Sequence, residues 1–226
     1  MRTGLASALL FGIVGVIILV GLGTWQMQRL EWKEDLLARI EARISADPVA
    51  LPPGPDPEAD RYLPTALSGR FDDGVVRVLV SHKQMGAGYR LISPFETEGR
   101  RIMIDRGFIR VNSPLPDVPA GPVNVVGNLH WPDDRLASTP GNDLEGNIWF
   151  ARDIAEMAEF FAAEPVLVIA REIAPPEPEV TPFPVDTTGI PNDHLSYAAT
   201  WFSLAVLWAA MTGLLLWRRH KAGRTG

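Results

Sequence analysis

The chain has 226 residues, of which 46% are hydrophobic, and it contains 20 glycines, 20 prolines and no cysteine. The absence of cysteine excludes disulfides and thiolate metal sites. The net charge is −6, but five of the 21 basic residues lie at the two ends of the chain, and no acidic residue precedes Glu31 or follows Asp193. The segment between the ends therefore holds 16 basic and 27 acidic residues, a net charge of −11. Because nucleic acids attract basic surfaces, we expect no nucleic-acid partner.

The first uncharged run, residues 5–26, is long enough to cross a hydrocarbon core of about 30 Å as a helix. A cleaved signal peptide is the competing interpretation. It is disfavoured because the run exceeds an ordinary signal core and no A-x-A cleavage site follows it. Apolar residues at helical spacing continue beyond the run, at Leu30, Leu37 and Ile44. Residues 27–46 therefore predict a helical stalk that continues the membrane helix.

The middle of the chain has the pattern of a β-rich domain. Residues 47–62 form a Pro-rich linker before it, and residues 174–191 form a second one that leads an extended chain back to the membrane. Between them, residues 63–173 hold short Val/Ile-rich runs separated by turns, which favours an antiparallel sheet or small barrel. The expected strands are residues 63–71, 75–82, 89–95, 101–111, 123–131 and 166–172, with one helix at 153–163.

Catalytic motifs are missing from this domain. The sequence has no GxSxG, HExxH or Walker motif and no GxGxxG after a strand. Asp105 and Arg106 stand together in an expected strand, where such a pair is more often structural than catalytic. His82 and His130 have no partner at metal-ligand spacing, and copper delivery is disfavoured because the six methionines are scattered. We therefore expect a binding surface, and a protein that is not an enzyme.

The second uncharged run follows His194 and predicts a membrane helix over residues 192–217. Asn192 is a suitable N-cap and Asp193 suits the positive end of the helix dipole, so His194 is expected one turn inside the helix, at a membrane boundary. At helical spacing, His194 shares one stripe of the helix surface with Tyr197, Ala198, Trp201, Ala205 and Trp208. The flat aromatic side chains of this stripe, next to a histidine, can hold a planar cofactor. The alternative interpretation is an aromatic belt at the membrane surface with an interfacial histidine.

Small residues recur every four positions on both expected membrane helices. This spacing lets two helices approach closely, so we expect the two rows to face each other. The rows are Gly4, Ala8 and Gly12 on the first helix, and Ala205, Ala209 and Gly213 on the second.

The distribution of basic residues predicts the topology. They flank both termini, so residues 1–4 and residues 218–226 are expected in the cytoplasm. The fold class is thus a membrane α+β protein, with two transmembrane helices around an extracytoplasmic β-rich domain. In a Gram-negative cell this domain would be periplasmic and the helices would lie in the inner membrane. The outer ends of the two helices, including Arg29 and His194, must then lie at the same membrane face.

Several short motifs follow one another in order along nearly the whole chain. They are Leu22-Gly23-Thr24-Trp25-Gln26 with Arg29, Leu30 and Lys33; Gly69-Arg70-Phe71; Ile92-Ser93-Pro94-Phe95; Asp105-Arg106-Gly107-Phe108; Pro140 and Asn142 to Trp149; and Asn192 to Ala198 with Thr200-Trp201-Phe202. These motifs resemble those of the surfeit locus protein 1 family (the Surfeit/Shy proteins). Asp105 and Phe108 depart from the family pattern, because Asn and Trp are expected there.

The resemblance implies an assembly factor for haem-copper terminal oxidases of the cytochrome c oxidase type, linked to insertion of haem a into the catalytic subunit. In bacterial members the histidine at the start of the second helix is the proposed haem ligand, and here that position is His194. The implied partners are the catalytic subunit, the haem a synthesis machinery and membrane lipid. The alternative is a cofactor-free membrane scaffold that stabilises the catalytic subunit during assembly.

On this interpretation the haem a site comprises His194 as the iron ligand, with Tyr197, Trp201 and Arg29 around it. A neutral imidazole is a common axial ligand of haem iron. The apolar farnesyl tail would rest among Leu204, Leu207 and lipid, while Arg29 and Lys33 would pair with the propionates. A single histidine holds iron less firmly than two, which suits a carrier that releases its cargo.

Overall fold

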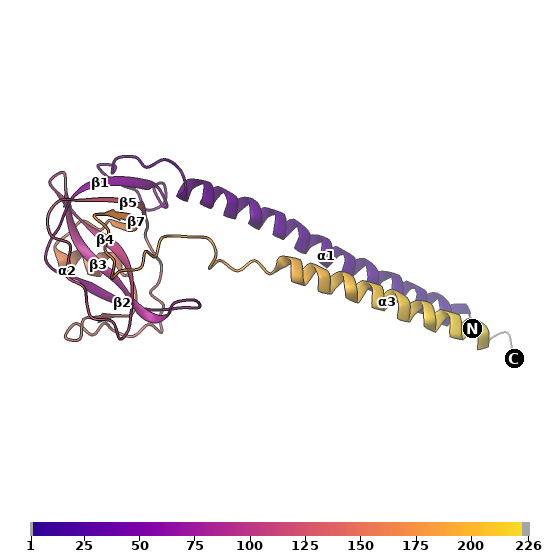
Figure 1. Ribbon diagram of the computed structural model, residues 1–226. Helices are drawn as coiled ribbons and strands as arrows, with labels where there is room; N and C mark the ends of the chain where they lie inside the picture. The colour runs from indigo at the N-terminus through magenta and orange to yellow at the C-terminus, as the bar shows by residue number, and fades with distance from the viewer. Residues whose placement is uncertain (1, 223–226) are drawn as a thin grey trace. The chain divides into compact units, whose positions relative to one another are not determined.

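The computed structural model describes residues 2–222. Contacts divide the chain into two compact units, one formed by the segments up to Arg39 and from Thr188, and the other by Ile40–Thr187 (Figure 1). The first unit is helical and the second is β-rich.

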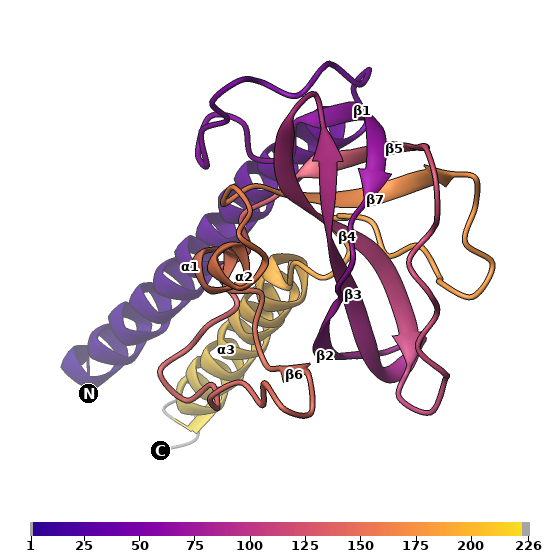
Figure 2. The same ribbon diagram turned by 90° about the vertical axis from the view of Figure 1, so that its left-hand side faces the viewer.

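A five-stranded barrel forms the β-rich unit (Figure 2). Its sheet extends beyond the barrel, from β3 to β2 (Val76–His82) and to the two-residue strand β6 (Ile148–Trp149). Of the two forms expected from the sequence, an antiparallel sheet or a small barrel, the structure has the barrel. Around the barrel the strands follow the order β1 (Pro64–Phe71), β5 (Val123–Leu129), β7 (Leu167–Ala174), β4 (Arg100–Arg110) and β3 (Gly86–Thr97), and β3 pairs again with β1.

Two strand pairs differ from the antiparallel arrangement expected for the domain. The β4–β7 and β2–β6 pairs are parallel, whereas the other pairs are antiparallel. Strand β6 was not predicted. The side chain of Asn147 holds it in place, donating to the carbonyl of Val75 at 2.7 Å and accepting from the amide of Arg77 at 3.3 Å. A strand held by such long-range bonds leaves little local pattern in the sequence.

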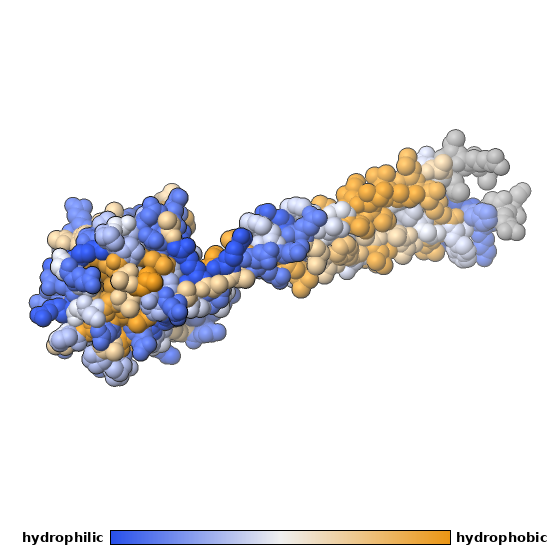
Figure 3. Space-filling model, turned by 90° about the horizontal axis from the view of Figure 1, so that it is seen from above, coloured by the Kyte–Doolittle hydropathy of each residue, from blue (hydrophilic) through white to orange (hydrophobic). Residues whose placement is uncertain are grey.

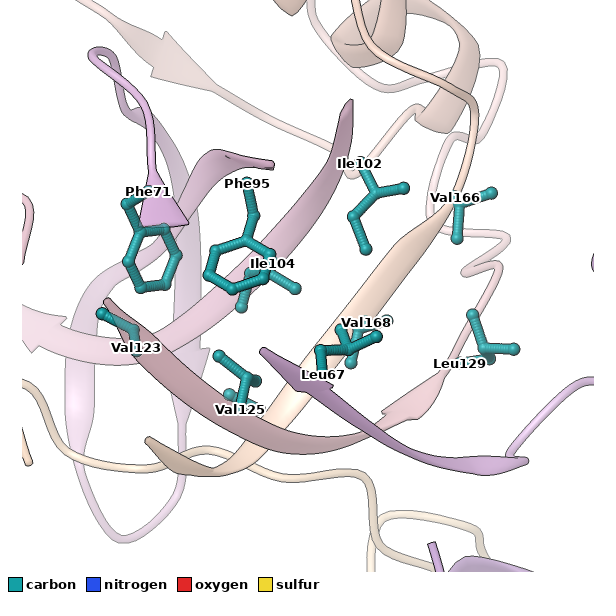
Figure 4. Close-up of a cluster of buried hydrophobic side chains, with 11 residues drawn as sticks. Leu67, Phe71, Phe95, Ile102, Ile104, Val123, Val125, Leu129, Val166 and Val168 are labelled. Atoms are coloured by element: carbon teal, nitrogen blue, oxygen red, sulfur yellow. The ribbon is translucent and has the colours of Figure 1, made fainter. Parts of the chain in front are cut away.

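Apolar side chains of β1, β3, β4, β5 and β7 fill the interior of the barrel (Figure 4). Gly69 allows the barrel to close, because a Cβ at this position would lie 2.0 Å from the carbonyl oxygen of Glu96 on β3. The Gly69-Arg70-Phe71 motif thus has a structural reason. The main cluster comprises Leu67, Phe71, Phe95, Ile102, Ile104, Val123, Val125, Leu129, Val166, Val168 and Ala170.

Helix α2 (Ile154–Phe161) packs on a second apolar cluster that includes the fully buried Trp149. Asp153 caps it as expected, accepting a hydrogen bond from the amide of Glu156 at 3.1 Å. The helix ends at Phe161, because Ala162 adopts the left-handed conformation with φ of 48°.

The Pro-rich segment after β7 is tied to the barrel. Phe108 and Thr181 exchange two backbone hydrogen bonds of 2.8 and 2.9 Å, and Arg90 donates to the carbonyl of Phe183 at 2.7 Å. Gly107 permits this close approach, since its φ is +129° and a Cβ there would lie 2.4 Å from the carbonyl oxygen of Thr181. Extended chain towards the second long helix is therefore bonded to the barrel as far as Phe183.

Two buried ion pairs involve the adjacent charged residues Asp105 and Arg106 of β4. Asp105 is fully buried and pairs with Arg90, whose side chain is 8% exposed. The other carboxylate oxygen of Asp105 accepts the amide of Gly107 at 3.1 Å. Arg106 pairs with Glu177 of the Pro-rich segment and donates to the carbonyl of Asp117. These contacts support the structural interpretation of the Asp105-Arg106 pair.

The helical unit contains α1 (Arg2–Ile44) as far as Arg39, together with α3 (His194–Ala222). Both helices are long and apolar enough to cross a membrane, and α1 continues as one helix from its uncharged run to Ile44. Helix α3 begins two residues later than predicted, because the carbonyl of Asp193 accepts the first helical hydrogen bond, from Tyr197 N at 3.2 Å. Asp193 thus occupies the N-cap position expected for Asn192. His194 is the first helical residue and does not lie one turn inside the helix.

Helices α1 and α3 pack antiparallel along a seam (Figure 1). A Cβ on Gly12 would lie 2.2 Å from Cγ2 of Thr212, and a Cβ on Gly23 would lie 2.7 Å from Cε1 of Phe202, so these glycines allow close contact. Away from the seam, the helix pair presents an apolar surface over the uncharged stretches of α1 and α3, and a hydrophilic surface follows along α1 (Figure 3). The buried seam residues are Gly12, Gly23 and Gln26 on α1, and Ala198 and Ala205 on α3.

The small-residue row predicted for α3 is only partly correct. Ala205 is in the seam, but Ala209 and Gly213 are exposed. A row with a four-residue spacing turns about 40° around the helix at each step, so it leaves a straight contact face within two steps. The face that contacts α1 instead mixes three- and four-residue steps, through the buried Ala198 and Ala205 and through Phe202, Trp208 and Thr212.

We expect Gly12→Leu to destabilise the helix pair by about 1–3 kcal/mol, because the new side chain must overlap Thr212. The thermal unfolding midpoint of the detergent-purified protein would measure this loss. Ala209→Leu adds the same side chain on the exposed face of α3 and should leave the midpoint unchanged. Equal effects of the two variants would contradict the observed seam.

Candidate functional site

The candidate site lies where the uncharged stretch of α1 ends, at Gln26, beside the start of the uncharged stretch of α3, at His194. His194 is half-buried, and its Nδ1 lies 2.8 Å from Oε1 of Gln26 on α1. Gln26 is 9% exposed. This is the only hydrogen bond of the His194 ring among the described residues, so Nε2 keeps no protein partner there. The arrangement leaves one imidazole nitrogen for an external ligand.

The predicted aromatic stripe is divided between two environments. Ala198 and Ala205 are buried in the seam against α1, so a planar ligand cannot rest on them while the helices are in contact. Tyr197 is 56% exposed, and Trp201 is half-buried. The accessible part of the stripe therefore runs from His194 along Tyr197 and Trp201, beside the seam.

Arg29 lies one turn beyond Gln26 on α1. It is exposed, and its Cζ lies 4.6 Å from the ring centroid of Trp32. The exposed Trp25 and Trp32 lie two turns apart, a distribution typical of an aromatic belt at a membrane surface. A guanidinium at this level can pair with an anionic group near His194.

These residues fit a haem. Nε2 of a neutral imidazole can coordinate iron while Nδ1 is held by a hydrogen bond, which is the usual arrangement of a ligating histidine. Leu204 and Leu207 are exposed on α3 and offer an apolar surface for a farnesyl tail. When bound, haem would supply an iron centre with an open coordination position. No group of three or more His, Cys, Asp or Glu side chains suited to a metal ion occurs within residues 2–222.

His130 of the barrel unit is in a different environment. Its ring stacks on Tyr62 with centroids 5.4 Å apart, and its Nδ1 is buried without a hydrogen-bond partner. Burial, followed by the positive charges of Arg152 and Arg61, lowers its pKa from 6.5 to about 4. His130 is thus a neutral packing residue at physiological pH.

This pKa predicts acid sensitivity of the barrel. The native state binds fewer protons than the unfolded state between pH 6.5 and 4, so the stability due to neutral His130 is lost as the pH falls through this window. The full loss is at most about 3 kcal/mol. His130→Phe retains an aromatic ring beside Tyr62 and should flatten the decrease in the unfolding midpoint from pH 7 to 4. An unchanged pH profile would contradict this role.

Together, the fold and the site define a class of protein: a small β-barrel domain between two helices long enough to span a membrane, with a histidine–amide pair at the end of their apolar stretch. The chain belongs to the SURF1 family, whose family model matches residues 13–206. This confirms the family predicted from the motifs.

Curated relatives support the assignment over most of the chain. The SURF1-like protein of Monosiga brevicollis is 33% identical over 233 residues, covering 93% of this chain and 87% of the relative. Surfeit locus protein 1 of Homo sapiens is 30% identical over 234 residues, covering 91% of this chain and 75% of the relative. The SURF1-like protein of Drosophila melanogaster is 31% identical over 225 residues, covering 88% of this chain and 73% of the relative.

Gln26 is the residue of the site to which the sequence patterns assigned no role. The available signal was an uncharged polar residue at the end of an apolar run, because such a residue on a membrane helix usually has a partner on a neighbouring helix.

Proposed function

We propose that the protein is an assembly factor for a haem-copper terminal oxidase, which binds haem a and assists its insertion into the catalytic subunit. The observation that carries the proposal is the His194–Gln26 pair, which leaves Nε2 of the imidazole available at the end of an apolar helix pair. Membership of the SURF1 family supports the role in oxidase assembly. The proposed role is that of a carrier and not of an enzyme.

In this proposal each residue of the site has a separate task. His194 would hold the iron through Nε2, and the aromatic side chains of Tyr197 and Trp201 would contact the haem. The positive charge of Arg29 would attract the haem propionates. The apolar farnesyl tail would then contact Leu204 and lipid. One protein ligand together with an open, lipid-facing side favours transfer to the catalytic subunit.

We further propose that the helices span the inner membrane with both termini in the cytoplasm and the barrel in the periplasm. The support is the placement of basic residues at both ends of the chain. The proposed partners are the catalytic subunit of cytochrome c oxidase, the haem a synthesis machinery and membrane lipid.

A cofactor-free scaffold is the second candidate. The observation that favours it is the burial of Ala198 and Ala205 in the seam, which removes part of the expected haem face. The absorption spectrum of the protein, purified in detergent from cells that synthesise haem a, separates the two. A carrier purifies with haem a, whereas a colourless protein that still binds the catalytic subunit is a scaffold.

A further inference from the structure

We propose that Gln26 is a positioning residue that sets the affinity of His194 for haem iron, an inference that rests on the proposed function. The distance of 2.8 Å between Oε1 of Gln26 and Nδ1 of His194 is that of a good hydrogen bond. An amide oxygen only accepts, so Nδ1 carries the proton in this pair. The lone pair of the neutral ring is then at Nε2, the nitrogen without a protein partner.

The surrounding helix contacts hold Gln26 in this position. Gly23, one turn earlier on α1, is buried against Phe202, and Ala198, one turn after His194 on α3, is buried in the seam. These contacts bring the two backbones close together beside the pair. Gln26 itself is 9% exposed, so water competes little for its amide oxygen. The imidazole is therefore presented in one orientation and one tautomer.

The choice of an amide also sets the strength of the ligand. A hydrogen-bond acceptor on the distal ring nitrogen increases the basicity of a ligating imidazole, and a carboxylate does so more strongly than a neutral amide. Glutamine thus gives a ligand of intermediate strength. Such a ligand binds haem but releases it to a site that holds the iron more firmly.

Full-length protein in detergent, titrated with haem a, tests this inference through two measurements, the dissociation constant and the reduction potential. Gln26→Leu removes the acceptor, and we expect the dissociation constant to rise about 10- to 100-fold and the potential to rise. Gln26→Glu strengthens the acceptor, so haem should bind more tightly and the potential should fall. Gln28→Leu and Gln28→Glu alter an exposed glutamine on the same helix and should change neither quantity.

The two Gln26 variants distinguish positioning from a simple interhelical hydrogen bond. If Gln26→Leu and Gln26→Glu both keep the wild-type potential, or both shift it in the same direction, the inference is wrong although the site still binds haem. If wild-type protein binds no haem a, the proposed function itself fails. If His194→Ala binds haem a as tightly as the wild type, His194 is not the ligand and the inference about Gln26 is wrong.

Discussion

Protein purified with the His194→Ala substitution should contain at least about tenfold less haem a than the wild type, because the iron loses its protein ligand. The substitution should leave the amount of protein in the membrane near normal. Alanine suits the first turn of α3, and the cost is one hydrogen bond to Gln26, about 1 kcal/mol. Oxidase assembled with this variant should carry less haem in its catalytic subunit. Pyridine haemochrome spectra of both proteins would measure the loss.

His220→Ala is the matched control, since His220 lies exposed in the last turn of the same helix. It should alter neither haem content nor oxidase assembly. Wild-type haem stoichiometry in the His194→Ala protein would refute ligation by this residue.

Asp105→Ala should destabilise the barrel by about 3–5 kcal/mol, the largest loss that we expect for a single substitution in that unit. The variant leaves the guanidinium of Arg90 charged, 8% exposed and without its carboxylate. The fully buried Asp105 also accepts the amide of Gly107, at the point where the Pro-rich segment pairs with β4. The effect therefore extends to the attachment of that segment. Chemical unfolding of the purified protein would measure it.

Two further variants control for this result. Arg135→Ala removes exposed ion pairs with Asp153 and Glu156 and should cost less than about 1 kcal/mol. Replacing both Arg90 and Asp105 with leucine removes both buried charges and should recover much of the stability lost by Asp105→Ala. Equal losses for Asp105→Ala and Arg135→Ala would show that the buried pair is not structural.

Local patterns explain which elements the sequence predicted well. The helices α1 and α3 follow from long uncharged runs, and the strands follow from short β-branched runs between turns. The N-cap of α2 was predicted correctly because its capping bond, from the amide of Glu156 to Asp153, lies within the helix itself. By contrast, β6 depends on the bonds of Asn147 to a distant strand, and periodicity carries no information about them.

The start of α3 shows the limit of such patterns within a single element. Asn192 and Asp193 are both good caps, so residue preference did not distinguish them. The backbone places Asp193 at the N-cap, which moves His194 to the first helical position. In this position the Nδ1 atom of His194 lies 2.8 Å from Oε1 of Gln26.

The sequence by itself determined that this protein has two helices long enough to span a membrane around a β-rich domain, and that it belongs to the SURF1 family. Composition, the period of the hydrophobic residues and the order of the motifs are properties of the sequence alone, so they do not depend on how distant segments pack. Only the tertiary structure decided that β4 and β7 run parallel, that Ala209 lies outside the helix seam, and that Gln26 holds His194. Each of these depends on the relative positions of segments far apart in the chain, where a rotation of one helix by one residue changes every contact.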